Sequence, residues 1–159
     1  MDRPRIYIET TIPSAYFDER PAAEMVARRE VTRRWWATAS ANYNLMTSMA
    51  VRKELASGPA LRQQSWLALI KPLPLLLVNP EVIDIAAIYR RHKLMPPGDA
   101  MHLAVASFYA CAYLLTWNFR HLANANKFEH IQSVSRRYGL HVPRIVAPPA
   151  LLEETGEQA

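Results

Sequence analysis

The chain of 159 residues contains one cysteine and four glycines. The single Cys111 excludes an intrachain disulfide and any zinc site built from several cysteines. With glycine only at positions 58, 98, 139 and 156, the sequence has neither a Walker loop nor a GxGxxG turn to hold the phosphates of a nucleotide. A GxSxG nucleophile elbow and an HExxH zinc helix are also missing. These absences exclude several common classes of enzyme.

The sequence also lacks a long apolar run, and its opening residues lead us to expect no leader segment. Its apolar runs, such as residues 73–78 with Pro74, are far shorter than the roughly 20 residues that cross a bilayer. The opening "MDRPRIYIET" moves directly into a strand-like pattern, with no basic segment followed by an apolar one. Cys111 lies in "YACAYLL" among apolar neighbours, which predicts a buried structural thiol. We therefore expect a cytoplasmic protein with no membrane partner.

Negative charge is the scarcer sign. Lys and Arg number 19 against 14 for Asp and Glu, which gives a formal net charge of +5, and 15 of the basic residues are arginine. Arginine binds phosphate with two parallel hydrogen bonds, so this balance slightly favours a polyanionic partner over an ordinary basic surface. With 50% hydrophobic residues, the chain can bury one substantial core. We predict one domain over residues 1–154 and a disordered tail over residues 155–159.

Short apolar runs alternate with segments of helical spacing along the chain. The strand-like runs are residues 5–9, 43–47, 75–78, 113–116 and 144–147. Helical patterns cover residues 22–39, 48–57, 59–70, 80–95, 98–108 and 128–138, with Ser48 as a cap and Gly58 and Gly139 as stop signals. Because parallel strands need long crossovers, this alternation predicts one α/β domain with a parallel sheet covered by helices on both faces.

Four polar residues stand at positions where such a sheet binds its ligands, beyond the carboxyl ends of the strands. Glu9 ends the first strand-like run, and Asn118 follows the fourth. Glu54 lies on the helix after the second run, and Asp99 lies near the start of the helix that leads into the fourth. Side chains from distant parts of the chain are therefore expected to converge on one edge of the sheet.

Local explanations compete with this convergence. Asp99 could cap its helix, and Glu54 could pair in solvent with Arg52 or Lys53. Glu9 is harder to explain locally, because a carboxylate at the end of an apolar strand is costly unless it is solvated, paired or bound to a cation.

If Glu9, Glu54 and Asp99 do meet, their mutual repulsion favours a divalent cation. Mg²⁺ or Mn²⁺ prefers oxygen ligands of this kind. Such an ion supports phosphodiester hydrolysis, and basic residues around the rim would contact a nucleic-acid backbone. His102 lies three residues after Asp99 on the same face of the helix, where a core or surface histidine is more common than a metal ligand.

Several stretches together resemble a known family. They are "IYIETTIPSAYFDER", "TSMAVRKEL", "PPGDAMHLAVASFYACAYLLTWNFRHLANA" and "IVAPPALLEE", and they cover nearly the whole chain. The sequence resembles the PIN-domain family, and specifically the VapC-like toxins of bacterial toxin–antitoxin pairs. The resemblance implies a three-layer sandwich with a parallel sheet ordered 3-2-1-4-5. It also implies a Mg²⁺- or Mn²⁺-dependent endoribonuclease that cuts RNA, is restrained by an antitoxin protein and commonly forms a homodimer.

The resemblance also assigns roles by position. Asp99 matches the aspartate of the family motif, and Glu54 matches its helix-borne acid. Where the family's first strand ends in Asp this chain has Glu9, whose extra methylene moves the carboxylate by roughly 1.5 Å. Where the fourth strand leads to Asp it has Asn118, which can offer a carbonyl oxygen but lacks the negative charge. The implied catalytic residues are these four, with Glu9, Glu54 and Asp99 as metal ligands.

Further residues are expected to orient the site or to contact substrate: Thr10, Thr11, Ser48, His102, Thr116 and Arg120. Thr10, Thr11 and Ser48 carry hydroxyls, for which capping of the turn after a strand is an equally good explanation. A rival function is a non-catalytic PIN-like module that binds RNA or a protein without cutting, and the departures at Glu9 and Asn118 favour it.

Overall fold

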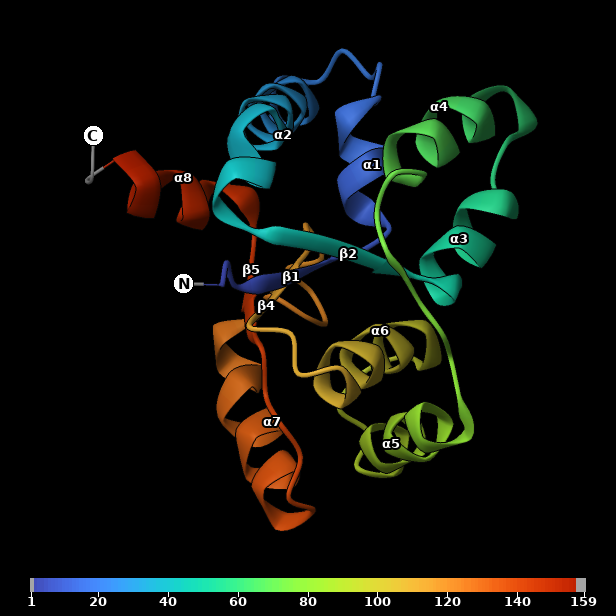
Figure 1. The fold of residues 1–159 in the computed structure, drawn as a ribbon, viewed down its shortest axis with the longest axis vertical. Helices are drawn as coiled ribbons and strands as arrows, with labels where there is room; N and C mark the ends of the chain where they lie inside the picture. Colours follow the sequence, from blue (N-terminus) through green and yellow to red (C-terminus); the bar gives the residue numbers. More distant parts are fainter. Residues whose placement is uncertain (1, 157–159) are drawn as a thin grey trace.

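The computed structural model describes residues 2–156, and side chains over residues 2–152. Its five-stranded sheet is parallel and ordered β3-β2-β1-β4-β5, with helices on both faces (Figure 1). The strands are β1 (Arg5–Ile8), β2 (Asn44–Ser48), β3 (Leu75–Leu76), β4 (Tyr113–Leu115) and β5 (Arg144–Val146). The helices are α1 (Thr11–Tyr16), α2 (Ala23–Asn42), α3 (Met49–Ala56), α4 (Ala60–Ile70), α5 (Pro80–Arg91), α6 (Pro97–Phe108), α7 (Ala125–Arg137) and α8 (Pro148–Gly156). The predicted three-layer α/β fold and strand order are confirmed.

The central strand β1 is buried on both faces, and its side chains alternate between two hydrophobic clusters. Ile6 and Ile8 pack with residues of α1, α2 and α8 on one face of the sheet. Tyr7 faces the opposite side, in the cluster that contains residues of α3 to α7. All three side chains are fully buried. A polar phenol is thus placed in the core, on the side of the sheet that α6 covers.

The switch point of the sheet lies between β1 and β4. From β1 the chain proceeds outward to β2 and β3, and then crosses to the other side for β4 and β5. Ile8 pairs in register with Leu115, and the backbone N–H of Glu9 donates to the carbonyl of Leu115 at 3.2 Å. Glu9 and Thr116 therefore leave the sheet side by side, at the edge where open α/β sheets bind ligands.

Some element boundaries differ from the prediction. Helix α1 directly follows Glu9 where the sequence indicated only a turn, and it accommodates Pro13 because the first turn of a helix has no internal partners for its N–H groups. Helix α7 begins at Ala125, three residues earlier than predicted, because the side chain of Asn124 accepts from the N–H of Asn126. The last helix reaches Gly156; residues 157–159 of the expected tail lie outside the described part.

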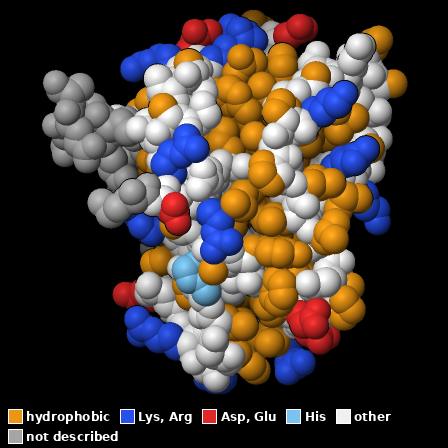
Figure 2. Space-filling model, in the orientation of Figure 1, with side chains coloured by type: hydrophobic (Ala, Val, Ile, Leu, Met, Phe, Trp, Pro, Cys, Tyr) orange, Lys and Arg blue, Asp and Glu red, His pale blue; other side chains and the backbone are white. Residues whose placement is uncertain are grey.

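The surface shows no single basic stripe on the face drawn in Figure 2. Lys and Arg side chains are dispersed over that face, and hydrophobic side chains form a band down its middle. In the core, Cys111 is fully buried and burial raises the pKa of its thiol to about 11, as expected for a structural cysteine. Within residues 2–156, none of the helices combines the length and the apolar character that crossing a bilayer requires.

Candidate metal and catalytic site

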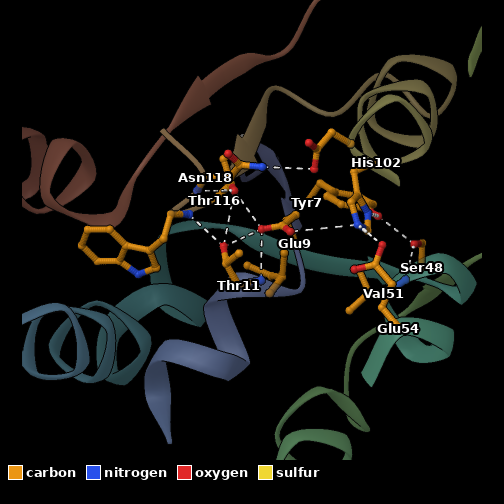
Figure 3. A network of polar contacts seen from close by, with 12 residues as sticks. Tyr7, Glu9, Thr11, Ser48, Val51, Glu54, His102, Thr116 and Asn118 are labelled. Atoms are coloured by element: carbon orange, nitrogen blue, oxygen red, sulfur yellow. Dashed lines mark hydrogen bonds and ion pairs between the residues drawn. The ribbon is translucent and has the colours of Figure 1, made fainter. Parts of the chain in front are cut away.

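The Glu9 carboxylate is held in place by threonines from two strand ends. It is only 3% exposed. Its Oε2 accepts hydrogen bonds from the backbone N–H of Thr11 at 3.0 Å, from the Thr11 hydroxyl and from the Thr116 hydroxyl at 2.8 Å (Figure 3). Its other oxygen, Oε1, lies 4.0 Å from Nε2 of His102. One oxygen is therefore fixed by the fold, and the other faces the centre of the site.

His102 links three elements around that centre. Its ring is 1% exposed, and Nδ1 lies 2.7 Å from the hydroxyl of Tyr7 on β1. That hydroxyl is also 2.7 Å from Oγ of Ser48 at the end of β2 (Figure 3). On the other side of the ring, Nε2 is hydrogen-bonded to Oε1 of Glu54 at 2.8 Å. Burial lowers the pKa of His102, but the Glu54 hydrogen bond and the surrounding carboxylates outweigh it and raise the pKa above its ordinary value.

Glu54 lies on α3 with its side chain 42% exposed. The expected pairing with Arg52 or Lys53 is wrong, because its described ion pair is with His102. Burial raises the pKa of Glu54, but the hydrogen bond and charge of His102 outweigh this effect and lower the pKa. Beside Glu54 is a mainly apolar depression of about 650 Å³, whose lining includes Met49 and both basic neighbours of Glu54.

Asp99 and Asn118 form the second part of the site. Asp99 lies in the first turn of α6 and makes no side-chain cap bond, so the interpretation of Asp99 as a helix cap is wrong. Its Oδ1 accepts a hydrogen bond at 3.1 Å from Nδ2 of Asn118, whose Oδ1 accepts from the backbone N–H of His121 at 3.0 Å. The N–H of His121 fixes the orientation of the amide, because only the amide oxygen can accept it. Burial raises the pKa of Asp99, against the opposing charges of His102 and His121.

One oxygen of Glu9, one oxygen of Glu54 and one nitrogen of His102 all lie within 4.8 Å of one another. Two ligands of one ion at about 2.1 Å are about 3 Å apart at a right angle and about 4 Å apart when opposite, so these donors fit a single divalent cation after small movements. Asp99 is outside this group, although its charge helps to raise the pKa of His102 and the charge of Glu54 helps to raise the pKa of Asp99. The Thr116 hydroxyl joins the two parts, since it donates to Glu9 and accepts the N–H of Asn118 at 3.0 Å.

Three further residues that were predicted to orient the site or to contact substrate, Thr10, Ser48 and Arg120, each lie in different surroundings. The Thr10 hydroxyl is buried without a hydrogen-bond partner of good geometry, although it lies close enough to Glu54 to help lower that pKa. A buried hydroxyl without a partner is what a bound ion with its waters would satisfy. Ser48 caps α3 by accepting from the N–H of Val51, as predicted. Arg120 is exposed, and its side chain takes part in none of the hydrogen bonds described above for the site.

Sequence reasoning missed Tyr7, the residue that holds the ring of His102. The signal was present in the alternation along "RIYIE". In a central strand with Ile6 and Ile8 on one face, Tyr7 must face the other layer of helices. Its hydroxyl is the polar group of that strand which needs a partner in the core.

Comparison with known proteins identifies the family. The PIN domain matches residues 6–127, which is well over half of the chain and includes Glu9, Glu54, Asp99 and Asn118. The chain therefore belongs to the PIN-domain family. None of the curated proteins with which it was compared matches its sequence.

Solved structures show the same fold at low sequence identity. VapBC2 from Rickettsia felis, bound to a DNA fragment from its promoter, has 12% identity and a TM-score of 0.59, over 90% of this chain and 98% of that one. A toxin–antitoxin complex from Klebsiella pneumoniae has 14% identity and a TM-score of 0.59, over 90% and 97% of the two chains. VapBC-1 from nontypeable Haemophilus influenzae has 14% identity and a TM-score of 0.55, over 91% and 98%.

Proposed function

We propose that this protein is a VapC-like toxin, an endoribonuclease that hydrolyses RNA phosphodiester bonds with a divalent cation, Mg²⁺ or Mn²⁺. The observation that carries the proposal is the convergence of the Glu9 and Glu54 carboxylates at the switch point of the sheet, with Asp99 close by. Membership of the PIN-domain family supports the same activity, because this fold and these acidic positions are typical of metal-dependent nucleases.

The side chains divide the work of the proposed site. Glu9, Glu54 and Asp99 hold the cation, and the threonine hydroxyls keep the Glu9 carboxylate aimed at it. Asn118 orients Asp99 through its amide N–H. When bound, a divalent cation supplies positive charge that polarises the phosphodiester and makes water easier to deprotonate. The proposed phosphate site lies on the edge of the sheet. Its carboxylates repel the phosphate of the RNA, so a cation must bind before the phosphate can.

Single-stranded RNA suits the surroundings of this site. Arg52 and Lys53 line the depression beside Glu54 and can contact phosphates. Phe119, next to Asn118, is 47% exposed, and the guanidinium of Arg28 lies 5.5 Å from the centre of its ring. Exposed aromatic rings with a neighbouring arginine stack well on unpaired bases. Arg120 is exposed on the same loop and available to a phosphate.

An antitoxin protein is the proposed partner that restrains the activity. The structural neighbours are described as toxin–antitoxin complexes or as VapBC proteins. This chain exposes apolar side chains that a partner would cover, among them Leu61 at 98% and Leu77 at 61%. A homodimer belongs to the same proposal and stays a prediction.

A non-catalytic binding module remains the second candidate, and the Asn118–Asp99 pair favours it. Where a second carboxylate would strengthen the demand for metal, the amide satisfies Asp99 within the protein itself. The site then carries one negative charge fewer for a cation.

A cleavage assay separates the two functions. End-labelled single-stranded RNA would be incubated with Mg²⁺, Mn²⁺ or EDTA, using the native protein, Asp99→Asn, and Glu129→Gln as a matched control on the exposed face of α7. The nuclease predicts metal-dependent cutting that is lost in Asp99→Asn and kept in Glu129→Gln. Equal traces of cutting in all three proteins, together with retained RNA binding, would reject the nuclease in favour of the binding module.

A further inference from the structure

The imidazole of His102 occupies the centre of the proposed metal site. Its Nε2 lies 2.8 Å from a Glu54 oxygen and 4.0 Å from a Glu9 oxygen. The ring is almost completely buried, so bulk water cannot replace the carboxylates as the partner of Nε2. Figure 3 shows the ring between the two carboxylates that the proposed function assigns to the cation.

The opposite side of the ring is held in the manner of a metal-bound histidine. A ligating histidine almost always uses its other nitrogen to hydrogen-bond a group that fixes the ring. Here Nδ1 contacts the fully buried Tyr7 hydroxyl at 2.7 Å, and that hydroxyl contacts Ser48 at 2.7 Å. If Nδ1–H donates to Tyr7 and Tyr7 donates to Ser48, each partner is satisfied and the lone pair of Nε2 faces Glu9 and Glu54.

We propose that Nε2 of His102 is a direct ligand of the cation, together with Glu9 and Glu54, and that this nitrogen makes the site prefer Mn²⁺ over Mg²⁺. Mg²⁺ is held by oxygen ligands and tolerates nitrogen poorly, whereas imidazole suits transition-metal ions. This inference rests on the proposed function and adds a nitrogen ligand beside its carboxylates, together with the choice of metal. It assigns direct metal binding to a histidine that was expected only to orient the site or to contact substrate.

The same geometry also suits a proton at this position. Nε2 lies 2.8 Å from an oxygen of Glu54 and 4.0 Å from an oxygen of Glu9, so an N–H on Nε2 would lie where the cation is proposed to bind. Such a proton would offset the repulsion between the carboxylates of Glu9 and Glu54, which both lie close to His102. Asp99, which the amide of Asn118 already satisfies, does not require this proton.

The alternative is that His102 is only a positioning residue, which holds Glu54 through a hydrogen bond and never touches the ion. Glutamine separates the two roles. Its side-chain N–H₂ can still donate to Glu54, but its amide does not offer a nitrogen lone pair to a metal. His102→Gln should therefore preserve a positioning role and abolish a ligand role.

Pulsed electron paramagnetic resonance of bound Mn²⁺ gives a readout that is independent of activity. A directly bound imidazole nitrogen couples to the electron spin of Mn²⁺ and produces a ¹⁴N modulation. We expect this modulation in the native protein and in His121→Gln, whose histidine lies near Asp99 but outside the donor group. We expect it to disappear in His102→Gln. Because the native spectrum needs no variant, the test holds even where the buried substitution fails to fold.

Metal affinity supplies the second measurement. Titration of Mn²⁺ into the native protein and His102→Gln, with Mg²⁺ as competitor, should show at least a tenfold loss of Mn²⁺ affinity in the variant, the order of effect that changes around a metal site produce. The Mg²⁺ affinity should change by less than about threefold, so the preference for Mn²⁺ should fall. Unchanged preference in a folded His102→Gln would overturn the inference.

The outcomes separate this inference from the proposed function. Bound Mn²⁺ without a ¹⁴N modulation, in a protein that still cuts RNA, means that His102 is a positioning residue and leaves the nuclease intact. Absence of bound Mn²⁺ at millimolar concentrations would overturn the inference, and RNA cutting in EDTA would then reject metal dependence as well.

Discussion

The two parts of the site compensate their carboxylates by different means. In the first part, Glu9 and Glu54 share the imidazole of His102, which can carry a positive charge. In the second part, Asp99 accepts a hydrogen bond from the neutral amide of Asn118. The pKa of Glu54 is lowered and that of Asp99 is raised, although both lie at the same edge of the sheet. The first part therefore depends on a positive charge between Glu9 and Glu54, and the second part does not.

This contrast changes the role that we assign to the Asn118 side chain. The family resemblance implies that it stands in place of an acid, and its amide oxygen was expected to face a metal or a water. In the structure that oxygen accepts the backbone N–H of His121, while the N–H₂ group serves Asp99. The residue is thus fitted to Asp99, and its neutrality is part of how a metal-free site with three acids remains stable.

The largest expected effect comes from the first part of the site. Glu9→Gln keeps the size of the side chain but removes the charge, and its amide cannot accept every hydrogen bond that Oε2 now accepts. We expect RNA cleavage to fall at least a hundredfold, which corresponds to about 2.7 kcal/mol. Initial rates with saturating Mn²⁺ measure the change, and Glu129→Gln is the matched control. Cleavage within threefold of the native rate would show that Glu9 does not hold the cation.

The next effect concerns the bond between the two parts. Thr116→Val is nearly isosteric, yet it removes a donor from Glu9 and leaves the half-buried N–H of Asn118 without its acceptor. We expect a loss of about 2 kcal/mol in the free energy of unfolding and reduced cleavage. Urea unfolding measures the first, with Thr116→Ser, which keeps the hydroxyl, as the control. Equal stability of the valine and serine variants would mean that Thr116 does not couple the two parts.

A smaller effect should follow from making the second part resemble the first. Asn118→Asp replaces the hydrogen bond to Asp99 with two facing carboxylates. In EDTA we expect a loss of about 1–2 kcal/mol, or about 3–6 °C in Tm, because a hydrogen bond becomes a repulsion. Saturating Mn²⁺ should reverse the loss. Asn126→Asp, on the exposed start of α7, should show neither change. A metal-independent Tm for Asn118→Asp would contradict the account.

The smallest effect is the opposite pH dependence of two carboxyl groups in the metal-free protein. A lowered pKa means that Glu54 stabilises the fold above its ordinary value of 4.5 and loses this contribution as the pH falls through its folded pKa. A raised pKa means that Asp99 contributes most below its ordinary value of 3.8 and loses this contribution as the pH rises through its folded pKa.

Unfolding of the native protein, Glu54→Gln and Asp99→Asn between pH 3 and pH 7 tests these signs. Relative to the native protein, Glu54→Gln should become less stable as the pH rises, and Asp99→Asn should become more stable. Each change should be below about 1 kcal/mol, because Glu54 is partly screened by solvent. Parallel profiles for the two variants would remove the distinction between the two parts.

The sequence was sufficient for the sheet and for the edge that holds the site. Strand-like runs separated by helical spacing predict a parallel sheet, and Glu9 and Asn118 each follow a run that becomes a strand. The family resemblance supplied the strand order, which the structure confirms. These features depend on the local residue pattern and on the order of the elements along the chain, and both can be read from the sequence.

The partners of the polar side chains could not be read from the sequence. Glu54 has basic neighbours at positions 52 and 53, but it turns inward to His102, because α3 lies against α6 in the folded chain. Tyr7 and His102 are 95 residues apart and meet only across two layers. The amide orientation of Asn118 depends on a backbone N–H that follows a turn. Such pairings depend on distances between elements, which local pattern does not specify.

We propose that one divalent cation binds between Glu9 and Glu54. A crystal structure of the protein with Mn²⁺, phased on the anomalous signal of the metal, tests it most directly. We expect an anomalous peak within bonding distance of an oxygen from each carboxylate, at the edge of β1. A peak only at other acidic groups, or none at millimolar Mn²⁺ with both carboxylates well ordered, would contradict it.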